Sequence, residues 1–205
     1  MGLFDAFRRP PPIREVGDLG VFIDERAAFV TQKGIYEYAR ARAGHYSKVL
    51  FRERPFQDAV DRSRWRAYPL GLAMVTELVE GIMRPHVGEH RRTALDSLNA
   101  LSLQVFDRYP VPAALGQVAW LESRRELARR LDLIGLHPPK PAKDIPEPFA
   151  ESYFALMPIH EKLRGRDFPT IRNYLRVTMC NIHEELTTRL DAPAIAAPLC
   201  NRALP

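Results

Sequence analysis

Lysine, cysteine and long apolar runs are scarce in this 205-residue chain. Only two cysteines occur, Cys180 and Cys200, which excludes a disulfide-dense scaffold and favours a reducing compartment. The longest apolar stretch, residues 68–83, is interrupted by Glu77 and Glu80. It is also shorter than the ~18 apolar residues that a membrane-spanning helix needs. The N-terminal residues lack the apolar core of a secretory signal peptide. We therefore predict a cytoplasmic protein without a transmembrane helix.

The motifs of several common enzyme classes are also missing. The chain contains no G-x-S-x-G nucleophile elbow, no G-x-x-x-x-G-K-[ST] phosphate loop and no G-x-G-x-x-G dinucleotide-binding sequence. It has no C-x-x-C sequence, and none of its six histidines follows a glutamate by three residues, as di-iron carboxylate proteins require. The sequence therefore indicates no catalytic class, and it predicts no cofactor.

Arginine supplies most of the positive charge. Of the 30 basic residues, 25 are arginine and 5 are lysine, against 25 acidic residues, so the net charge is +5. This skew is typical of a GC-rich, bacterial-type genome. A charge of +5 over 205 residues is also well below the charge density of a dedicated nucleic-acid-binding protein. An alternative is a surface on which arginines hold anionic head groups or phosphates.

What the chain does contain is a succession of helix patterns. Apolar residues recur at three- and four-residue steps, and no convincing β-hairpin pattern occurs. Two predicted apolar stripes are Leu95, Leu98, Leu101 and Val105, and Ile171, Leu175, Met179, Ile182, Leu186 and Leu190. We predict helices over residues 21–43, 56–67, 69–84, 89–109, 113–134, 149–157 and 167–190. Five prolines interrupt residues 137–148, which we expect to form an extended loop. The predicted fold is all-α, a single-domain bundle of six or seven helices with a proline-rich internal loop and extended termini.

The pattern divides the chain into three parts. We assign residues 1–20 to an N-terminal arm, residues 21–191 to the helical domain and residues 192–205 to a C-terminal tail. The tail is apolar and interrupted by prolines, and Arg202 is its only charged residue. Because exposed apolar stretches tend to mark docking sites, we expect the tail to pack on its own domain or on a partner.

One cluster matches a zinc-binding pattern. Residues 86–90 read H-x-x-E-H, in which His86 and His90 on one helical face would hold zinc and Glu89 would act as base. Pro85 and Gly88 instead favour a turn at this place. A further ligand would have to come from another segment, and the candidates are Glu161, His45 and His160.

Two other pairs lie one helical turn apart. Cys180 and His183 would bring a thiolate and an imidazole to one face of the last long helix, where they could bind a metal ion. The alternative is that Cys180 is a small buried hydrophobe. Glu77 and Glu80 occupy the most apolar helix and, if buried, would need a partner such as Arg84. We expect both glutamates at an exposed helix edge instead.

The N-terminal segment combines apolar and basic residues. Leu3, Phe4 and Phe7 fall near one face of a short helix, and Arg8 and Arg9 follow them. This composition suits a peripheral contact with a membrane surface or with a hydrophobic groove on a partner. The alternative is an arm that packs on its own domain or is frayed.

A second basic segment lies between residues 51 and 68, where arginines alternate with aromatic residues. The candidate contacts for an anionic surface are Arg52, Arg54, Arg62, Arg64, Trp65 and Arg66. Glu53, Asp58 and Asp61 lie among them, so we expect a largely self-neutralised, solvated face. Nucleic-acid binding here is a minor alternative, and it predicts a steep loss of affinity with salt.

These observations favour a non-catalytic interaction protein, an accessory, assembly or scaffold subunit of a larger complex with a protein partner. A membrane-peripheral variant would use residues 1–9. The alternative is a helical-bundle enzyme or small-ligand-binding protein, with a metal-dependent version that requires three converging ligands at ~2.0–2.2 Å from the ion. Its candidate ligands are His86, Glu89, His90, His160 and His183. The oligomeric state is left open.

Overall fold

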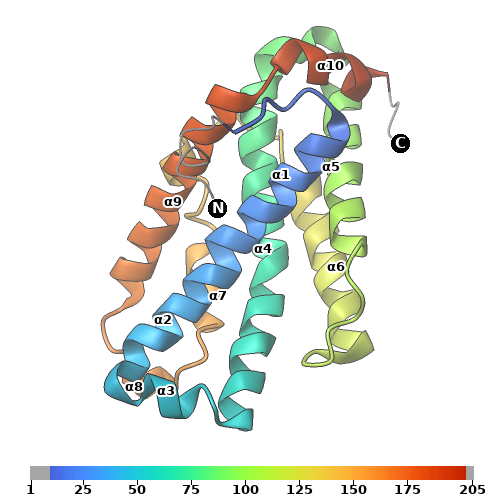
Figure 1. Cartoon of the computed structure of the whole chain (residues 1–205). Helices are drawn as coiled ribbons and strands as arrows, with labels where there is room; N and C mark the ends of the chain where they lie inside the picture. The colour runs from blue at the N-terminus through green and yellow to red at the C-terminus, as the bar shows by residue number, and fades with distance from the viewer. Residues whose placement is uncertain (1–9, 202–205) are drawn as a thin grey trace, which may run out of the picture.

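The computed structural model describes residues 10–201, apart from the side chain of Glu161, and it confirms the all-α prediction (Figure 1). Seven helices of nine residues or more form one bundle in the described part. They are α1 (Val16–Ala28), α2 (Gly34–Ala43), α4 (Arg54–Val87), α5 (Arg91–Asp107), α6 (Gly116–Asp132), α9 (Phe168–Arg189) and α10 (Ala192–Cys200). Shorter helices are α3 (Ser47–Leu50), α7 (Ala150–Ala155) and α8 (Glu161–Arg164).

Helices α1 and α2 follow each other almost without interruption, joined by a π-helical turn over Phe29–Lys33. A π turn takes backbone groups out of the α-helical hydrogen-bond register. Here the hydroxyl of Tyr153 donates to the carbonyl of Thr31 over 2.9 Å. The predicted end at Gly44 is confirmed, since α2 ends at Ala43 and Gly44 has a φ of +53°.

The start of this first helix differs from the prediction. The helix begins at Val16 rather than at residue 21. Gly17 and Gly20 lower the intrinsic helix propensity of this stretch, which concealed the start. Val16 and Leu19 are buried in the core, and their packing outweighs the cost of the two glycines.

Helix α4 is the central element, and it corrects the prediction of two separate helices. Its 34 residues run from Arg54 to Val87, with Pro69 and Pro85 inside the helix. A proline removes one backbone hydrogen bond and usually kinks or ends a helix. Pro69 is buried, and α4 packs against α1, α5, α6 and α10 along its length. This packing holds the helix continuous across Pro69, whereas Pro85 is exposed and lies in the last turn of α4.

The other predicted helices agree with the structure to within a few residues. On α5 the predicted apolar stripe is buried, and it contains Leu95, Leu98, Leu101 and Val105. On α9 five of the six stripe residues are buried, namely Ile171, Leu175, Met179, Ile182 and Leu186. The segment between α6 and α7 has a single 3₁₀ turn, Ala142–Asp144, and is otherwise irregular.

The apolar C-terminal residues pack on the bundle itself, one of the two outcomes expected for the tail. Helix α10 lies across one end of the bundle (Figure 1) and contacts α5, α4 and α1. Ile195 and Leu199 are buried, and the hydroxyl of Ser97 donates to the carbonyl of Leu199 over 2.9 Å. The described part of the tail therefore completes the core.

Candidate functional site

The predicted H-x-x-E-H cluster does not occupy one helical face. His86 lies in the last turn of α4, which ends at Val87 and is followed by Gly88 with a φ of +51°. Glu89 and His90 lie beyond this break in a 3₁₀ turn, and all three candidate side chains are exposed. Glycine readily adopts positive φ, so the chain turns at Gly88. The H-x-x-E-H residues therefore do not share one helix.

The remaining metal candidates are also dispersed. Cys180 and His183 are both exposed on α9, so Cys180 is not the buried hydrophobe of the alternative interpretation. His45 and His160 belong to the short turns at the end of the bundle where α3 and α8 lie (Figure 1). The Glu161 side chain lies outside the described part. Within that part, no three His, Cys, Asp or Glu side chains are arranged to hold a metal ion.

Five candidate contact residues lie outside the described residues: Leu3, Phe4, Phe7, Arg8 and Arg9. The described chain begins at Pro10 and is fixed to the bundle at Ile13, which is buried. The backbone N–H of Ile13 donates to the carbonyl of Arg189 over 2.8 Å. Peripheral contact through residues 1–9 therefore stays a prediction.

The basic segment around residues 52–66 is partly neutralised by neighbouring carboxylates. Arg54 lies 3.0 Å from Asp58, and Arg64 lies 3.4 Å from Asp61. Trp65 is half-buried and packs edge-on against three other aromatic rings, so it belongs to an aromatic cluster of the bundle. Three further arginines of the segment are exposed: Arg52, Arg62 and Arg66.

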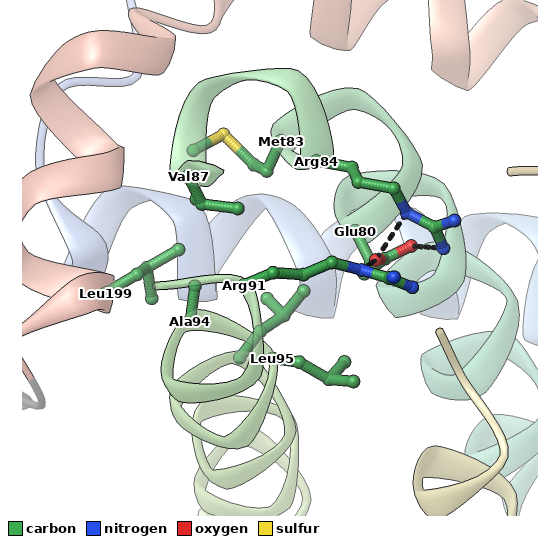
Figure 2. A pocket seen from close by; sticks show the side chains of 9 residues that line it. Glu80, Met83, Arg84, Val87, Arg91, Ala94, Leu95 and Leu199 are labelled. Carbon is green, nitrogen blue, oxygen red and sulfur yellow. Dashed lines mark hydrogen bonds and ion pairs between the residues drawn. The ribbon is translucent and has the colours of Figure 1, made fainter. Parts of the chain in front are cut away.

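Glu77 and Glu80 are buried, which corrects the expectation that they lie at an exposed helix edge. Their exposed fractions are 8% and 5%. Glu80 accepts hydrogen bonds from Arg84 at 2.8 and 2.6 Å, and the Arg91 Nε lies 3.5 Å from it, as Figure 2 shows. Lys140 donates to Glu77 over 2.8 Å. Of these cations, the sequence pattern indicated only Arg84, because the others come from distant segments.

The same cations hold the segment that follows α6. Arg84 donates to the carbonyl of His137 over 2.9 Å, and Arg91 donates to the carbonyl of Gly135. The imidazole Nε2 of His137 lies 3.5 Å from Glu77. A proline-rich segment cannot satisfy its own backbone carbonyls in a helix, so these side chains satisfy them instead. We call the following set the acid clamp: Glu77, Glu80, Arg84, Arg91 and Lys140.

Two adjoining cavities are lined by α4, α6 and residues 133–156. The first encloses about 300 Å³, and its apolar lining includes Leu70, Leu127 and Leu156. The second encloses about 320 Å³ and is lined mainly by apolar side chains, with Glu77 and Lys140 of the acid clamp at its edge. Arg130 lines both cavities, and its guanidinium carbon lies 5.1 Å from the ring centroid of Phe149. We call the two cavities together the α6 groove.

Large apolar side chains are exposed at this groove. Leu133 and Leu136 line the second cavity with exposed fractions of 61% and 69%. Val118 and Leu121 on α6 are also exposed, but they do not line either cavity. The sequence pattern did not indicate Leu133 and Leu136, because they lie beyond the end of α6 and form no continuous pattern with its buried face. Exposed apolar side chains beside a concave surface are typical of an interaction site.

Asp24 joins α1 to α4 and to the segment that follows α5 at a separate polar cluster. It accepts hydrogen bonds from the hydroxyls of Tyr68, at 2.6 Å, and Tyr109, at 2.8 Å. Burial, together with the hydrogen bond to Asp24, raises the pKa of Tyr109 from 10.0 to about 12. Burial and the same carboxylate also raise the pKa of Tyr68 above its usual range. Both tyrosines therefore act as hydrogen-bond donors that brace the helices.

Comparison with protein-family models, curated proteins and solved structures finds no match for this chain. In residues 10–201, no helix has both the length and the apolar character needed to cross a membrane. The geometry of the chain itself is therefore the basis for a functional proposal.

Proposed function

We propose that this chain is a non-catalytic interaction protein, an accessory, assembly or scaffold subunit whose α6 groove receives an amphipathic segment of a protein partner. The observation that carries the proposal is the exposure of Leu133 and Leu136 at the mouth of an apolar cavity. In the bound state these side chains would be buried, together with the apolar face of the partner segment. No catalytic step is part of the proposal.

The mixed charge of the groove supports a protein partner. Its polar lining contains Arg66, Glu122, Glu126 and Arg130 in the first cavity, and Glu77 with Lys140 in the second. Both signs of charge are present, whereas a site for a polyanion would be of one sign. An amphipathic helix with apolar anchors and charged flanks of both signs fits this surface.

The acid clamp supports the proposal because it fixes one wall of the groove. Residues 133–140 are held to α4 and α5 by hydrogen bonds from Arg84 and Arg91, and the ion pair of Lys140 with the buried Glu77 adds a further contact to α4. A wall that is already ordered loses little conformational entropy when a partner binds. The cytoplasm is the compartment we propose, since the chain has only two cysteines and both are free.

The test is site-specific photo-crosslinking of the full chain in its host. A photoreactive residue replaces Leu133 or Leu136 at the groove, and Val177 on α9, which is 51% exposed, serves as the matched control. We expect both groove positions to give an adduct with the same protein, and Val177 to give none. With that partner purified, the Leu133→Ser/Leu136→Ser variant should bind at least about tenfold more weakly than Val177→Ser. Equal adducts at all three positions, or none at the groove, would overturn the proposal.

A second candidate function is binding of a small ligand in the second cavity. Its volume of about 320 Å³ lies within the ~300–1,000 Å³ typical of ligand sites. Its lining is mainly apolar, with Lys140 and Arg130 as polar groups that would orient an anionic end of the ligand. Native mass spectrometry of the protein isolated gently from its host separates the two functions. A bound small-molecule mass favours the ligand, and a co-purifying protein chain favours the partner.

A further inference from the structure

One end of the bundle carries exposed apolar and basic side chains together. Residues 44–54, which include α3, and residues 161–167, which include α8, lie at the same end (Figure 1). An ion pair of 3.4 Å between Arg42 and Asp167 joins α2 to the start of α9 beside them. Tyr46, Val49 and Leu163 are 74%, 57% and 62% exposed. We call this surface the α3–α8 end.

The charge of the α3–α8 end is strongly biased. Its two segments hold six Lys or Arg residues and three Asp or Glu residues, a net charge of +3 out of the +5 of the whole chain. Four of the cations are exposed and form no ion pair with any acidic side chain that the structure describes: Lys48, Arg52, Lys162 and Arg166. Arg54, the last residue of the first segment, is instead paired with Asp58.

The backbone that carries the apolar residues is held rigidly. Arg164 donates to the carbonyls of Phe154, Met157 and Ile159 over 3.0, 3.0 and 2.7 Å, which fixes the turn that presents Leu163. Phe51 packs against Tyr36 and Phe56 with ring centroids 5.0 Å apart in each pair. The exposed side chains at this end therefore do not arise from a loose loop.

We infer that the α3–α8 end docks onto the surface of an anionic lipid bilayer. Tyr46, Val49 and Leu163 would enter the boundary between head groups and acyl chains, where tyrosine is favoured. The four cations around them would meet the lipid phosphates and carboxylates. Apolar and basic groups on one surface fit this partner, because a polyanion in water would bind the cations but not the apolar side chains. The inference is independent of the α6 groove.

The experiment is co-sedimentation of the full chain with phosphatidylcholine vesicles that contain about 30% phosphatidylserine. We expect binding to these vesicles, little binding to phosphatidylcholine alone, and release in about 0.5 M NaCl. Two variants test the surface: Tyr46→Ser/Val49→Ser/Leu163→Ser, and Lys48→Ala/Arg52→Ala/Lys162→Ala/Arg166→Ala. Each should lower the vesicle partition coefficient by at least about tenfold, with helicity and melting temperature unchanged.

Matched variants elsewhere on the surface provide the controls. The apolar control is Val21→Ser/Val111→Ser/Val177→Ser, at positions that are 48%, 39% and 51% exposed. The charge control is Arg14→Ala/Arg92→Ala/Arg125→Ala/Arg129→Ala, which also removes four positive charges. Both should bind vesicles within about twofold of the unmodified chain.

Three outcomes would overturn the inference. The first is no binding of the unmodified chain to the anionic vesicles. The second is loss of binding in Phe4→Ser/Phe7→Ser with none in the two α3–α8 variants, which would assign membrane contact to residues 1–9 instead. The third is an equal loss of vesicle binding in the test and control charge variants, while the apolar test variant binds normally. In this case the unmodified chain would also bind a single-stranded oligonucleotide as well as it binds the vesicles. That pattern would indicate nonspecific polyanion binding.

Discussion

Helix α4 is held by two different kinds of contact, about two turns apart. At Gly71 an added Cβ would lie 2.6 Å from the carbonyl oxygen of Ala27, so α1 crosses α4 at backbone contact. At Glu77 and Glu80 the neighbouring segments are held by buried ion pairs of the acid clamp. A close-packed crossing tolerates no added atom, whereas a buried ion pair tolerates no loss of a partner.

The two contacts also differ in what they position. The crossing at Gly71 joins two helices, and Ala27 and Gly71 both lie in stretches whose sequence pattern predicts a helix. The acid clamp joins α4 to residues 133–140, which have no regular structure to support them. Ion pairs and hydrogen bonds therefore position the wall of the α6 groove, whereas close packing of two helices positions the scaffold beneath it. Four substitutions separate these contributions.

The largest effect is expected at Arg84. Replacing Arg84→Met leaves the buried carboxylate of Glu80 with only the more distant Arg91, so the free energy of unfolding should fall by about 3 kcal/mol. Urea denaturation measures this loss. Hydrogen exchange should also show that residues 133–140 lose protection, because the carbonyl of His137 loses its donor.

The matched control for Arg84 is Arg92→Met. Arg92 pairs with Asp96 at 3.1 Å, also four residues apart on a helix, but its side chain is 78% exposed. The same substitution should cost less than about 0.5 kcal/mol there. Equal losses in the two variants would mean that the clamp contributes no more than a surface ion pair.

A somewhat smaller loss is expected at the crossing. Gly71→Ala should lower the free energy of unfolding by about 2 kcal/mol, since the new methyl group meets backbone that cannot rotate away. Gly81→Ala on the same helix is the control, because its Cβ would lie 3.7 Å from Pro139, an ordinary contact. Alanine should gain about 0.5–1 kcal/mol at that position from helix propensity. A stabilised Gly71→Ala variant in thermal denaturation would contradict the close crossing.

A loss of about 1 kcal/mol is expected for Lys140→Met, because Lys140 is 31% exposed and His137 stays near Glu77. Salt distinguishes this contact from the crossing. In about 1 M NaCl the difference between the unmodified chain and Lys140→Met should shrink, while the cost of Gly71→Ala should stay constant. Urea titrations of the two variants at low and high salt check this. A salt-independent Lys140 effect would indicate packing by its aliphatic stem instead.

The smallest effect at neutral pH is expected at the tyrosine cluster beside the crossing. Tyr109→Phe should cost less than about 1 kcal/mol at pH 7, because Tyr68 still donates to Asp24. The pKa of Tyr109 is raised from 10.0 to about 12 in the folded chain. The folded state therefore favours the protonated hydroxyl, and the resulting stability is complete below pH 10 and lost as pH rises toward 12.

Alkaline denaturation of the two proteins measures this contribution. Between pH 10 and pH 12 the unmodified chain should lose stability more steeply than Tyr109→Phe, so the two curves converge. Parallel curves over that range would show that Tyr109 titrates in the folded chain as it does when unfolded.

Much of the fold could be predicted from local sequence pattern. The apolar spacing on α5 and α9 specifies which face is buried, because a helix repeats every 3.6 residues. The glycine at position 44 correctly predicted the end of α2, because a residue that readily adopts positive φ is favoured there. The same local rules failed at Gly17 and Pro69. Glycine and proline do lower the stability of a helix at these positions, but contacts with distant residues outweigh that cost.

The candidate site could not be predicted to the same extent. The pattern around Glu77 and Glu80 pointed to an exposed edge, and only Arg84, on the same helix, was recognised as a partner. Lys140 lies 63 residues beyond Glu77 in the chain, so no spacing rule connects them. The exposed leucines at 133 and 136 belong to an irregular segment without any periodicity.

The sequence by itself therefore determined the all-α class, most helix boundaries and the apolar stripes, because each depends on neighbours within a few residues. Only the tertiary structure decided that Glu77 and Glu80 are buried, that the proline-rich segment is bound to α4 and that the α6 groove exists. These features depend on which distant charges and side chains meet, and burial of a carboxylate is stable only when such partners are supplied.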